Sequence, residues 1–288
     1  MPRTSNFFLD CVFYIYDSQQ AAMANKRVGG SGFLAAVRFE ENPLQFEIYA
    51  VTAAHVLKGL LQNGGNPFLR MNMRCEQKIE VIETPATAWV KHPNADDIAV
   101  CPLRISTMRL KSLCVETDRF LTKVTIEDED IGIGDEVFMV GRFAHHSGDE
   151  TQNIPALRFG NIAMMDRQPI HREDGIIQES FLVECRSIPG YSGSPVFAYK
   201  RNFEEQPRVS PFQGYSKGWW LLGVDWCHLQ DTGYVREKKA GKETTRKSFV
   251  EVSTGMAGVI PAWKILEVFS TEELVKQRQT KDKAISAE

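Results

Sequence analysis

A serine stands at the tip of a glycine-rich turn in "SIPGYSGSPVFAY", residues 187–199. A serine hydroxyl is a weak nucleophile unless a base takes its proton and nearby donors stabilise the oxyanion that forms. Gly190 permits a backbone conformation closed to other residues, so the N–H groups of Gly190 and Ser192 can point toward one site, as an oxyanion hole requires. A plain glycine corner explains the same letters, so the turn alone leaves both interpretations open.

A serine nucleophile also needs a histidine base and an acid that orients the histidine. His55 follows a β-rich run and two alanines in "AVTAAHVL", at the start of a predicted short helix, and the other histidines lack this context. Asp96 and Asp97 precede the apolar run "IAV"; Asp97 adjoins it directly and is the preferred acid. Singly, a structural histidine and a turn aspartate explain these residues. The order His55, Asp97, Ser192 makes joint chemistry the stronger hypothesis.

The elements that must position these residues are short β-rich runs separated by turn residues. Runs such as "SGFLAAVRFE", "FEIYAVTAA", "DEVFMVGRF" and "WWLLGVDWCHL" predict an all-β sandwich or barrel. Two helices are predicted, one in "AAHVLKGLLQNGG" and one that opens at Pro261, with a polar tail that frays beyond Lys276. Residues 201–218 predict a long hairpin loop, and residues 236–247, "REKKAGKETTRK", a solvated loop. A boundary near residue 130 divides the strands into two similar sets.

Composition excludes several classes of protein. The 288 residues are 43% apolar and 25% charged, as in ordinary folded domains. The net charge of -3 argues against binding to nucleic acid or an anionic membrane, and no apolar run approaches a membrane span. Asp10 and Asp17 interrupt the apolar N-terminus, so no signal peptide is predicted. We therefore expect a cytoplasmic protein with reduced thiols.

Metal-binding patterns are not found in the sequence. No C-x-x-C pair occurs, and H-E-x-x-H, the signature of many metalloproteases, does not occur either. We expect neither a metal nor a cofactor.

Seven segments, in this order, resemble the trypsin-like (chymotrypsin-fold) serine proteases, and in style the bacterial Deg/HtrA proteases and the staphylococcal glutamyl endopeptidase. The segments are "GGSGFLAAV" (29–37), "VTAAHVL" (51–57), "DIAV" (97–100), "GDEVFMVGRF" (134–143), "GYSGSPVF" (190–197), "LLGVDW" (221–226) and "GMAGVIPAWKI" (255–265). They span nearly the whole chain.

The resemblance implies an all-β fold of two six-stranded antiparallel β-barrels with a C-terminal α-helix. Residues 1–130 would form the barrel that carries His55 and Asp97. Residues 131–258 would form the barrel that carries Ser192, the oxyanion hole and the specificity pocket, and residues 259–288 the helix and polar tail. His55 would act as general base and then general acid, while Asp97 holds its tautomer.

The resemblance also implies a substrate pocket. The strand "LLGVDW" would pair with extended substrate backbone, so that Asp225 and Trp226 border the pocket. Arg186 lies in the segment that lines this pocket in the family, where a cation favours an acidic substrate side chain. Two alternatives remain open: Asp225 forms a salt bridge that neutralises Arg186, or Asp225 itself favours a basic side chain in the substrate. The preferred residue at the cut is left open.

Several residues depart from the family pattern. Ser194 stands where many relatives have glycine, Tyr191 where a small or acidic residue is common, and Asp225 where relatives carry Ser, His or Asn. No recognition domain follows the protease segments. The leading hypothesis is a serine endopeptidase that acts on protein or peptide substrates, with a dedicated protein target or activator as a further expectation. The alternative is a partner-activated or catalytically silent peptide-binding module on a protease fold.

Overall fold

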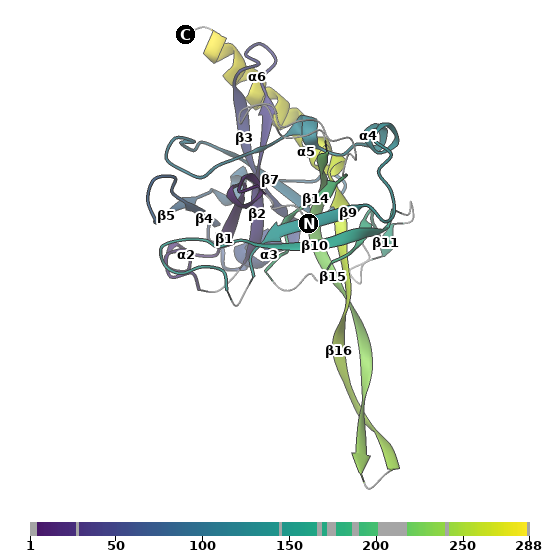
Figure 1. Ribbon diagram of the computed structural model, residues 1–288. Coiled ribbons are helices and arrows are strands. Elements are labelled where there is room, and N and C mark those ends of the chain that lie inside the picture. The colour runs from purple at the N-terminus through teal and green to yellow at the C-terminus, as the bar shows by residue number, and fades with distance from the viewer. Residues whose placement is uncertain are drawn as a thin grey trace.

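Two β-sheets, one from each half of the chain, form the body of the protein (Figure 1). The computed structural model describes residues 5–26, 29–143, 146–165, 169–171, 177–185, 190–200, 218–239 and 242–286. Within these residues no helix is long and apolar enough to cross a membrane.

The N-terminal sheet has eight strands in the order β5–β4–β1–β2–β3–β7–β6, with β8 parallel to β2. The strands are β1 (Val12–Tyr16), β2 (Gly30–Arg38), β3 (Phe46–Ala53), β4 (Phe68–Asn72), β5 (Ile79–Glu83), β6 (Val90–Lys91), β7 (Ile98–Leu103) and β8 (Val115–Glu116). The implied closed barrel is not found in this half of the described chain. The edge strand β6 has only two residues, and both pair with β7, so no ladder joins it to β5 at the other edge.

The second half forms a closed six-stranded barrel in the order β10–β13–β16–β15–β14–β9, as implied. Its strands are β9 (Glu136–Gly141), β10 (Ala156–Met164), β13 (Phe181–Glu184), β14 (Pro195–Tyr199), β15 (Trp219–Lys239) and β16 (Lys242–Pro261). Beside it β11 (Ile170–His171) pairs with β12 (Ile177–Gln178). The change of sheet falls between β8 and β9, near residue 130; the three predicted domain ranges stay a prediction.

Strands β15 and β16 continue beyond the barrel as a two-stranded ribbon that runs away from the body (Figure 1). Cross-strand pairs extend to Lys239 and Lys242. The prediction of a loop over residues 236–247 is therefore wrong for residues 236–239 and 242–247, and residues 240–241 lie outside the described residues. The sequence of this segment lacks apolar residues, which are the usual signal of a strand. Two neighbouring strands can still satisfy their backbone N–H and C=O groups by pairing with one another. Most of the hairpin loop predicted over residues 201–218 lies outside the described residues.

The described residues also form six α-helices. They are α1 (Phe7–Asp10), α2 (Gln19–Met23), α3 (Ala54–Leu60), α4 (Lys123–Asp128), α5 (Trp263–Phe269) and α6 (Glu272–Ser286). The C-terminal helix is thus two helices, and its tail does not fray after Lys276. Asp282 is buried on α6, where its carboxylate accepts hydrogen bonds from the Glu41 N–H at 2.9 Å and the Asn42 side chain at 2.6 Å. These contacts anchor a polar helix that has little apolar surface.

An aromatic cluster joins the N-terminus to the barrel. The ring of Phe8, on α1, lies 4.7 Å from Phe138, 4.8 Å from Phe197 and 5.1 Å from Trp219, measured between ring centroids. All four residues are buried in one core that includes residues of both sheets. Apolar burial of this kind fixes the two halves together, so loops from each half meet in a defined geometry.

Candidate active site

The predicted base and acid lie together. The Asp97 carboxylate contacts His55 twice: Oδ2 lies 2.6 Å from the ring Nδ1, and Oδ1 accepts the His55 backbone N–H at 2.7 Å. His55 is the second residue of α3, where backbone N–H groups lack helical partners, so an anionic side chain suits this position. Asp97 is 3% exposed and His55 is 37% exposed. The buried carboxylate therefore orients the ring and leaves the imidazole accessible.

The predicted nucleophile turn has the backbone conformation that its glycines predict. Gly190 has φ of 105° and Gly193 φ of 87°, both in the region that favours glycine. The Ser194 N–H donates to the Tyr191 carbonyl at 2.8 Å, which closes the turn around Ser192. Neither the Gly190 nor the Ser192 N–H donates to another described residue. Two backbone donors beside Ser192 that have no partner among the described residues suit the predicted oxyanion site.

Ser31, on β2, holds the Ser192 turn against the N-terminal sheet. Its N–H donates to the Ser192 carbonyl at 2.9 Å, and its hydroxyl donates to the Gly190 carbonyl at 2.7 Å. The same hydroxyl accepts the Arg142 backbone N–H at 2.9 Å. No role for Ser31 was predicted from the sequence, where its one signal is its place in "GGSGF" beside close-packing glycines.

The Ser192 turn lies next to the helix that carries His55. A Cβ on Gly30 would come within 2.9 Å of both the Ser192 carbonyl oxygen and a Val56 methyl, so these groups flank one glycine. In the described residues no hydrogen bond joins the Ser192 hydroxyl to His55. Such bonds are often long without substrate and tighten when it binds. The structure thus brings His55 and Asp97 into contact and places Ser192 nearby.

Gln178, which sequence analysis did not identify, supports Asp97 from the other half of the chain. Its side-chain oxygen accepts the Asp97 backbone N–H at 3.0 Å, and its amide nitrogen donates to the Asp96 carboxylate at 2.7 Å. Gln178 is fully buried on β12. Both ends of its amide are used to fix the loop that carries the acid. A glutamine in an irregular stretch carries no sequence signal for such a role.

An ion-pair cluster lies behind the same loop. Both ring nitrogens of buried His92 contact carboxylates, Nδ1 to Asp96 at 3.1 Å and Nε2 to Glu267 at 2.9 Å. These three side chains have the donor types of a metal site. Lys264 Nζ, however, lies 3.3 Å from each of the two carboxylates and supplies the positive charge. Burial opposes that charge, but Asp96 and Glu267 raise the pKa of Lys264 above its ordinary value. The cluster ties α5 to the residues before Asp97.

Tyr191, whose role the sequence left open, is a core residue of the barrel. It is fully buried, its hydroxyl donates to the Ala156 carbonyl at 3.4 Å, and the Arg158 guanidinium lies 5.3 Å from its ring centroid. Burial raises the pKa of the Tyr191 hydroxyl, so it stays protonated. Ser194 is also fully buried and packs against Gly141. These departures from the family pattern anchor the turn in the barrel core.

The predicted pocket residues are placed in part. The Asp225 backbone bonds to the turn, because its carbonyl accepts the Gly193 N–H at 2.8 Å and its N–H donates to Ser194 at 2.9 Å. The Asp225 side chain is buried. The pKa of nearby Cys185 is raised to about 11, mainly because the thiol is buried and secondly because of the negative charge of Asp225. Arg186 lies outside the described residues, so its pairing with Asp225 stays a prediction.

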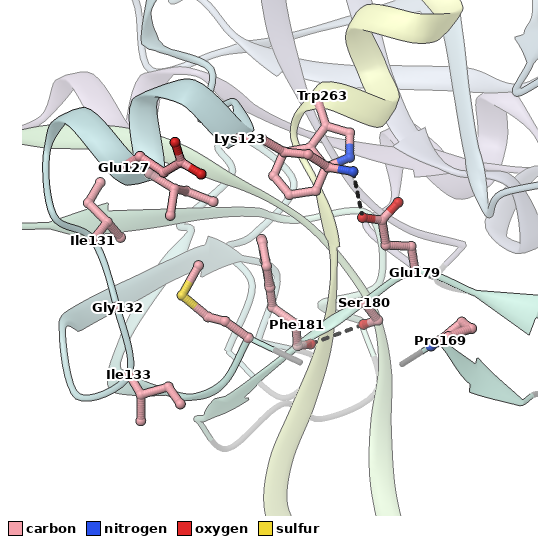
Figure 2. A pocket seen from close by; sticks show the side chains of 12 residues that line it. Lys123, Glu127, Ile131, Gly132, Ile133, Pro169, Glu179, Ser180, Phe181 and Trp263 are labelled. Atoms are coloured by element: carbon pink, nitrogen blue, oxygen red, sulfur yellow. Dashed lines mark hydrogen bonds and ion pairs between the residues drawn. The ribbon is translucent and has the colours of Figure 1, made fainter. Parts of the chain in front are cut away.

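A cavity of about 810 Å³ opens between α4 and the start of β13 (Figure 2). Its lining includes Ile126, Ile131, Phe181, Trp263, Lys123 and Glu179. Figure 2 shows Lys123 and Glu179 facing one another, with Nζ 3.6 Å from the carboxylate. Ser180 also lines the cavity, and its hydroxyl accepts the Trp226 indole N–H at 3.0 Å. None of the described site residues predicted from the sequence lines this cavity, and Trp226 contacts its lining only through Ser180.

Comparison with known proteins identifies the family. The trypsin-like peptidase domain matches residues 30–203, more than half of the chain. The chain belongs to the trypsin-like peptidase family. This confirms the resemblance found in the sequence and gives the site a family context of protein hydrolysis.

Comparison with solved structures identifies proteins of similar fold. This trypsin-like peptidase is similar to the apo MamO protease domain from Magnetospirillum magneticum, with a TM-score of 0.53 and 14% identity over 90% of this chain and 96% of that one. It also aligns with Deg5 (TM-score 0.46, 16% identity, 77% and 83% covered) and with the inactive form of the Rv3671c protease (0.43, 12%, 91% and 89%). No curated protein matches the chain. At these identities the likeness shows the fold alone.

Proposed function

We propose that this trypsin-like peptidase is a serine endopeptidase that hydrolyses peptide bonds of protein substrates through His55, Asp97 and Ser192. The observation that carries the proposal is the 2.6 Å contact between His55 Nδ1 and the buried Asp97 carboxylate, beside the Ser192 turn. A carboxylate that accepts the Nδ1–H leaves the lone pair on Nε2, the tautomer that a general base needs. We further propose a cytoplasmic setting, supported by six cysteines that form no disulfide among the described residues.

In the proposed reaction Ser192 Oγ attacks the substrate carbonyl carbon as His55 Nε2 takes its proton. The Gly190 and Ser192 N–H groups stabilise the oxyanion. His55 then gives the proton to the leaving amine, and the C–N bond breaks to leave an acyl-enzyme. Water attacks this ester with His55 again as base, and the acid product leaves Ser192 free. Residues 221–226 are proposed to pair with the substrate backbone, with Asp225 and Trp226 at the border of the substrate pocket and Arg186 in its lining.

A fluorophosphonate probe, which reacts covalently with activated serines, tests the proposal directly. Wild type should label, while Ser192→Ala should not, and His55→Ala should label at least about 10³-fold more slowly because the triad acts as a unit. The buried Ser112→Ala variant is a matched serine control and should label normally. Equal labelling of wild type and Ser192→Ala would refute the assignment.

The alternative is a partner-activated or catalytically silent peptide-binding module. The observation that favours it is the lack of a described hydrogen bond between Ser192 and His55. It predicts no cleavage of a diverse peptide library by the pure protein, together with binding of a specific peptide. Ser192-dependent cleavage of any peptide in that library excludes a silent site.

A further inference from the structure

Two arginines are buried where the two halves of the protein meet. Arg70 lies on β4 of the N-terminal sheet, and Arg142 directly follows β9 of the barrel. Their exposed fractions are 0% and 2%. Arginine is almost never fully buried unless it is paired with an opposite charge, because removal of water disfavours the charged form strongly. Both positions therefore call for a counter-charge.

The described chain supplies neutral acceptors to both arginines and a carboxylate to neither. Arg70 Nη1 donates to the Asn153 side-chain oxygen, and Nη2 donates to the Asp149 backbone carbonyl at 2.5 Å. Arg142 Nη2 reaches the Asn25 side-chain oxygen at 3.3 Å. Carbonyl and amide oxygens satisfy hydrogen bonds but leave the net charge in place. Among the described residues, therefore, no carboxylate forms an ion pair with either guanidinium group.

The acid nearest in sequence to these contacts is already occupied. The Asp149 carboxylate accepts hydrogen bonds from the Thr151 N–H at 2.7 Å and the Gln152 N–H at 3.0 Å, and Asp149 is exposed. Hydrogen bonds with Thr151 hold the pKa of this carboxyl below its ordinary value. Asp149 thus caps its own turn, and its negative charge acts on Arg70 only from a distance, without a described ion pair.

Four donor groups in this region are buried without a partner in the described residues: Arg70 Nε, Arg142 Nε, Arg142 Nη1 and the Tyr14 hydroxyl. They belong to one cluster. The Arg142 guanidinium lies 5.4 Å from the Tyr14 ring centroid and 5.5 Å from that of Tyr16. Burial lowers the pKa of Arg70, and the nearby positive charge of Arg142 lowers it further, so the two guanidinium groups act on one another.

We propose that a small inorganic anion binds between Arg70 and Arg142 and accepts hydrogen bonds from the donors that the chain leaves unpartnered. An anion supplies both missing elements, the negative charge and the acceptor atoms, whereas a water molecule supplies acceptors alone. The burial of both arginines selects a small ion over the carboxylate of a peptide or the phosphate of a nucleotide. Tyr14 contributes its hydroxyl as a neutral donor.

The site is connected to the candidate active site by one residue. The backbone N–H of Arg142 donates to the Ser31 hydroxyl, which in turn holds the Gly190 carbonyl. A bound anion that fixes Arg142 therefore also fixes the support of the Ser192 turn. The inference itself concerns binding and stability, so it stands or fails independently of proteolysis.

Thermal unfolding at constant ionic strength tests the proposal with chloride as the probe. In the titration, chloride is exchanged for gluconate so that the ionic strength stays constant. Gluconate is too large to enter a buried site. The wild-type unfolding midpoint should rise with chloride and saturate, as expected for a ligand that binds only the folded state. Arg142→Met should lose the response. Arg38→Met should keep it, because Arg38 is an exposed arginine that pairs with Glu116 at 2.7 Å.

Two further measurements apply even where Arg142→Met does not fold. Tyr14→Phe removes a single donor and should shift half-saturation to several-fold higher chloride. Crystals grown in bromide should show an anomalous peak between the two guanidinium groups. No chloride response in wild type, an unchanged response in Arg142→Met, or bromide peaks confined to the surface would each overturn the proposal.

Discussion

Ser31→Ala tests the support of the proposed oxyanion site. The substitution removes one hydroxyl that donates to Gly190 at 2.7 Å and accepts from Arg142 at 2.9 Å, in a residue with 0% exposure. Both backbone groups then lose this partner in a buried place, and each such loss costs about 1–3 kcal/mol. We expect the free energy of unfolding to fall by about 2–6 kcal/mol.

Activity should fall for a separate reason. Loss of one oxyanion donor lowers kcat by about 10²–10³ in proteases. Ser31→Ala keeps the Gly190 N–H but removes the hydrogen bond to the Gly190 carbonyl, so the backbone dihedral angles of Gly190, and with them the direction of its N–H, are less constrained. We therefore expect a decrease of about 10- to 100-fold in kcat and in the rate of fluorophosphonate labelling, with KM nearly unchanged. Chemical denaturation and labelling kinetics measure the two effects on the same preparation.

Thr84→Val is the matched control. The Thr84 hydroxyl is also buried, donates to the Pro67 carbonyl at 2.9 Å and accepts the Trp89 indole N–H at 3.0 Å. Its loss should destabilise the protein by a similar amount without touching the Ser192 turn. The reasoning is refuted if Ser31→Ala labels at the wild-type rate, or if Thr84→Val slows labelling equally.

Three other predictions follow from the same contacts. Gln178→Leu should lower kcat with little change in KM, since the Asp97 N–H loses its acceptor; a pure loss of stability with normal kcat would show that Gln178 does not position the acid. Gly193→Ala should abolish activity, because its Cβ would collide with the Ser31 carbonyl, whereas Gly64→Ala, also at positive φ but in open space, should cost only about 1 kcal/mol and leave kcat intact. Exposed Cys75 should react rapidly with a thiol reagent in native protein, and a Cys75→Ser variant should lose that fast phase. Burial raises the pKa of Cys101 and Cys114 to about 12, so fast reaction of either thiol at pH 8 would contradict the structure.

The site residues that the sequence could predict are those whose chemistry appears in local patterns. Glycines around a serine predict the Ser192 turn, and Gly190 and Gly193 both have positive φ in the structure. An aspartate at the entry of an apolar run predicts a buried acid, and Asp97 is buried against His55. Both patterns depend on neighbours along the chain, so a single sequence reveals them.

The supports of these residues could not be predicted, because they act across long sequence separations. Ser31 reaches Gly190, and Gln178 reaches Asp97, only after the two sheets have packed together. A buried serine and a buried glutamine have no local signature, since their value lies in satisfying backbone groups from another element. The same holds for the buried pair Arg70 and Arg142, which looks like ordinary surface charge in the sequence.

Local sequence patterns were enough to predict a mostly β trypsin-like fold and the residue types that could do chemistry, because strand periodicity, turn glycines and the order of the motifs can be read along the chain. Tertiary structure alone decided that the first half is an open sheet, that residues 236–239 and 242–247 form a ribbon, and that His55 meets Asp97. Closure of a sheet and contact between distant side chains depend on packing interactions between residues far apart in the sequence. A short stretch of sequence therefore cannot predict them.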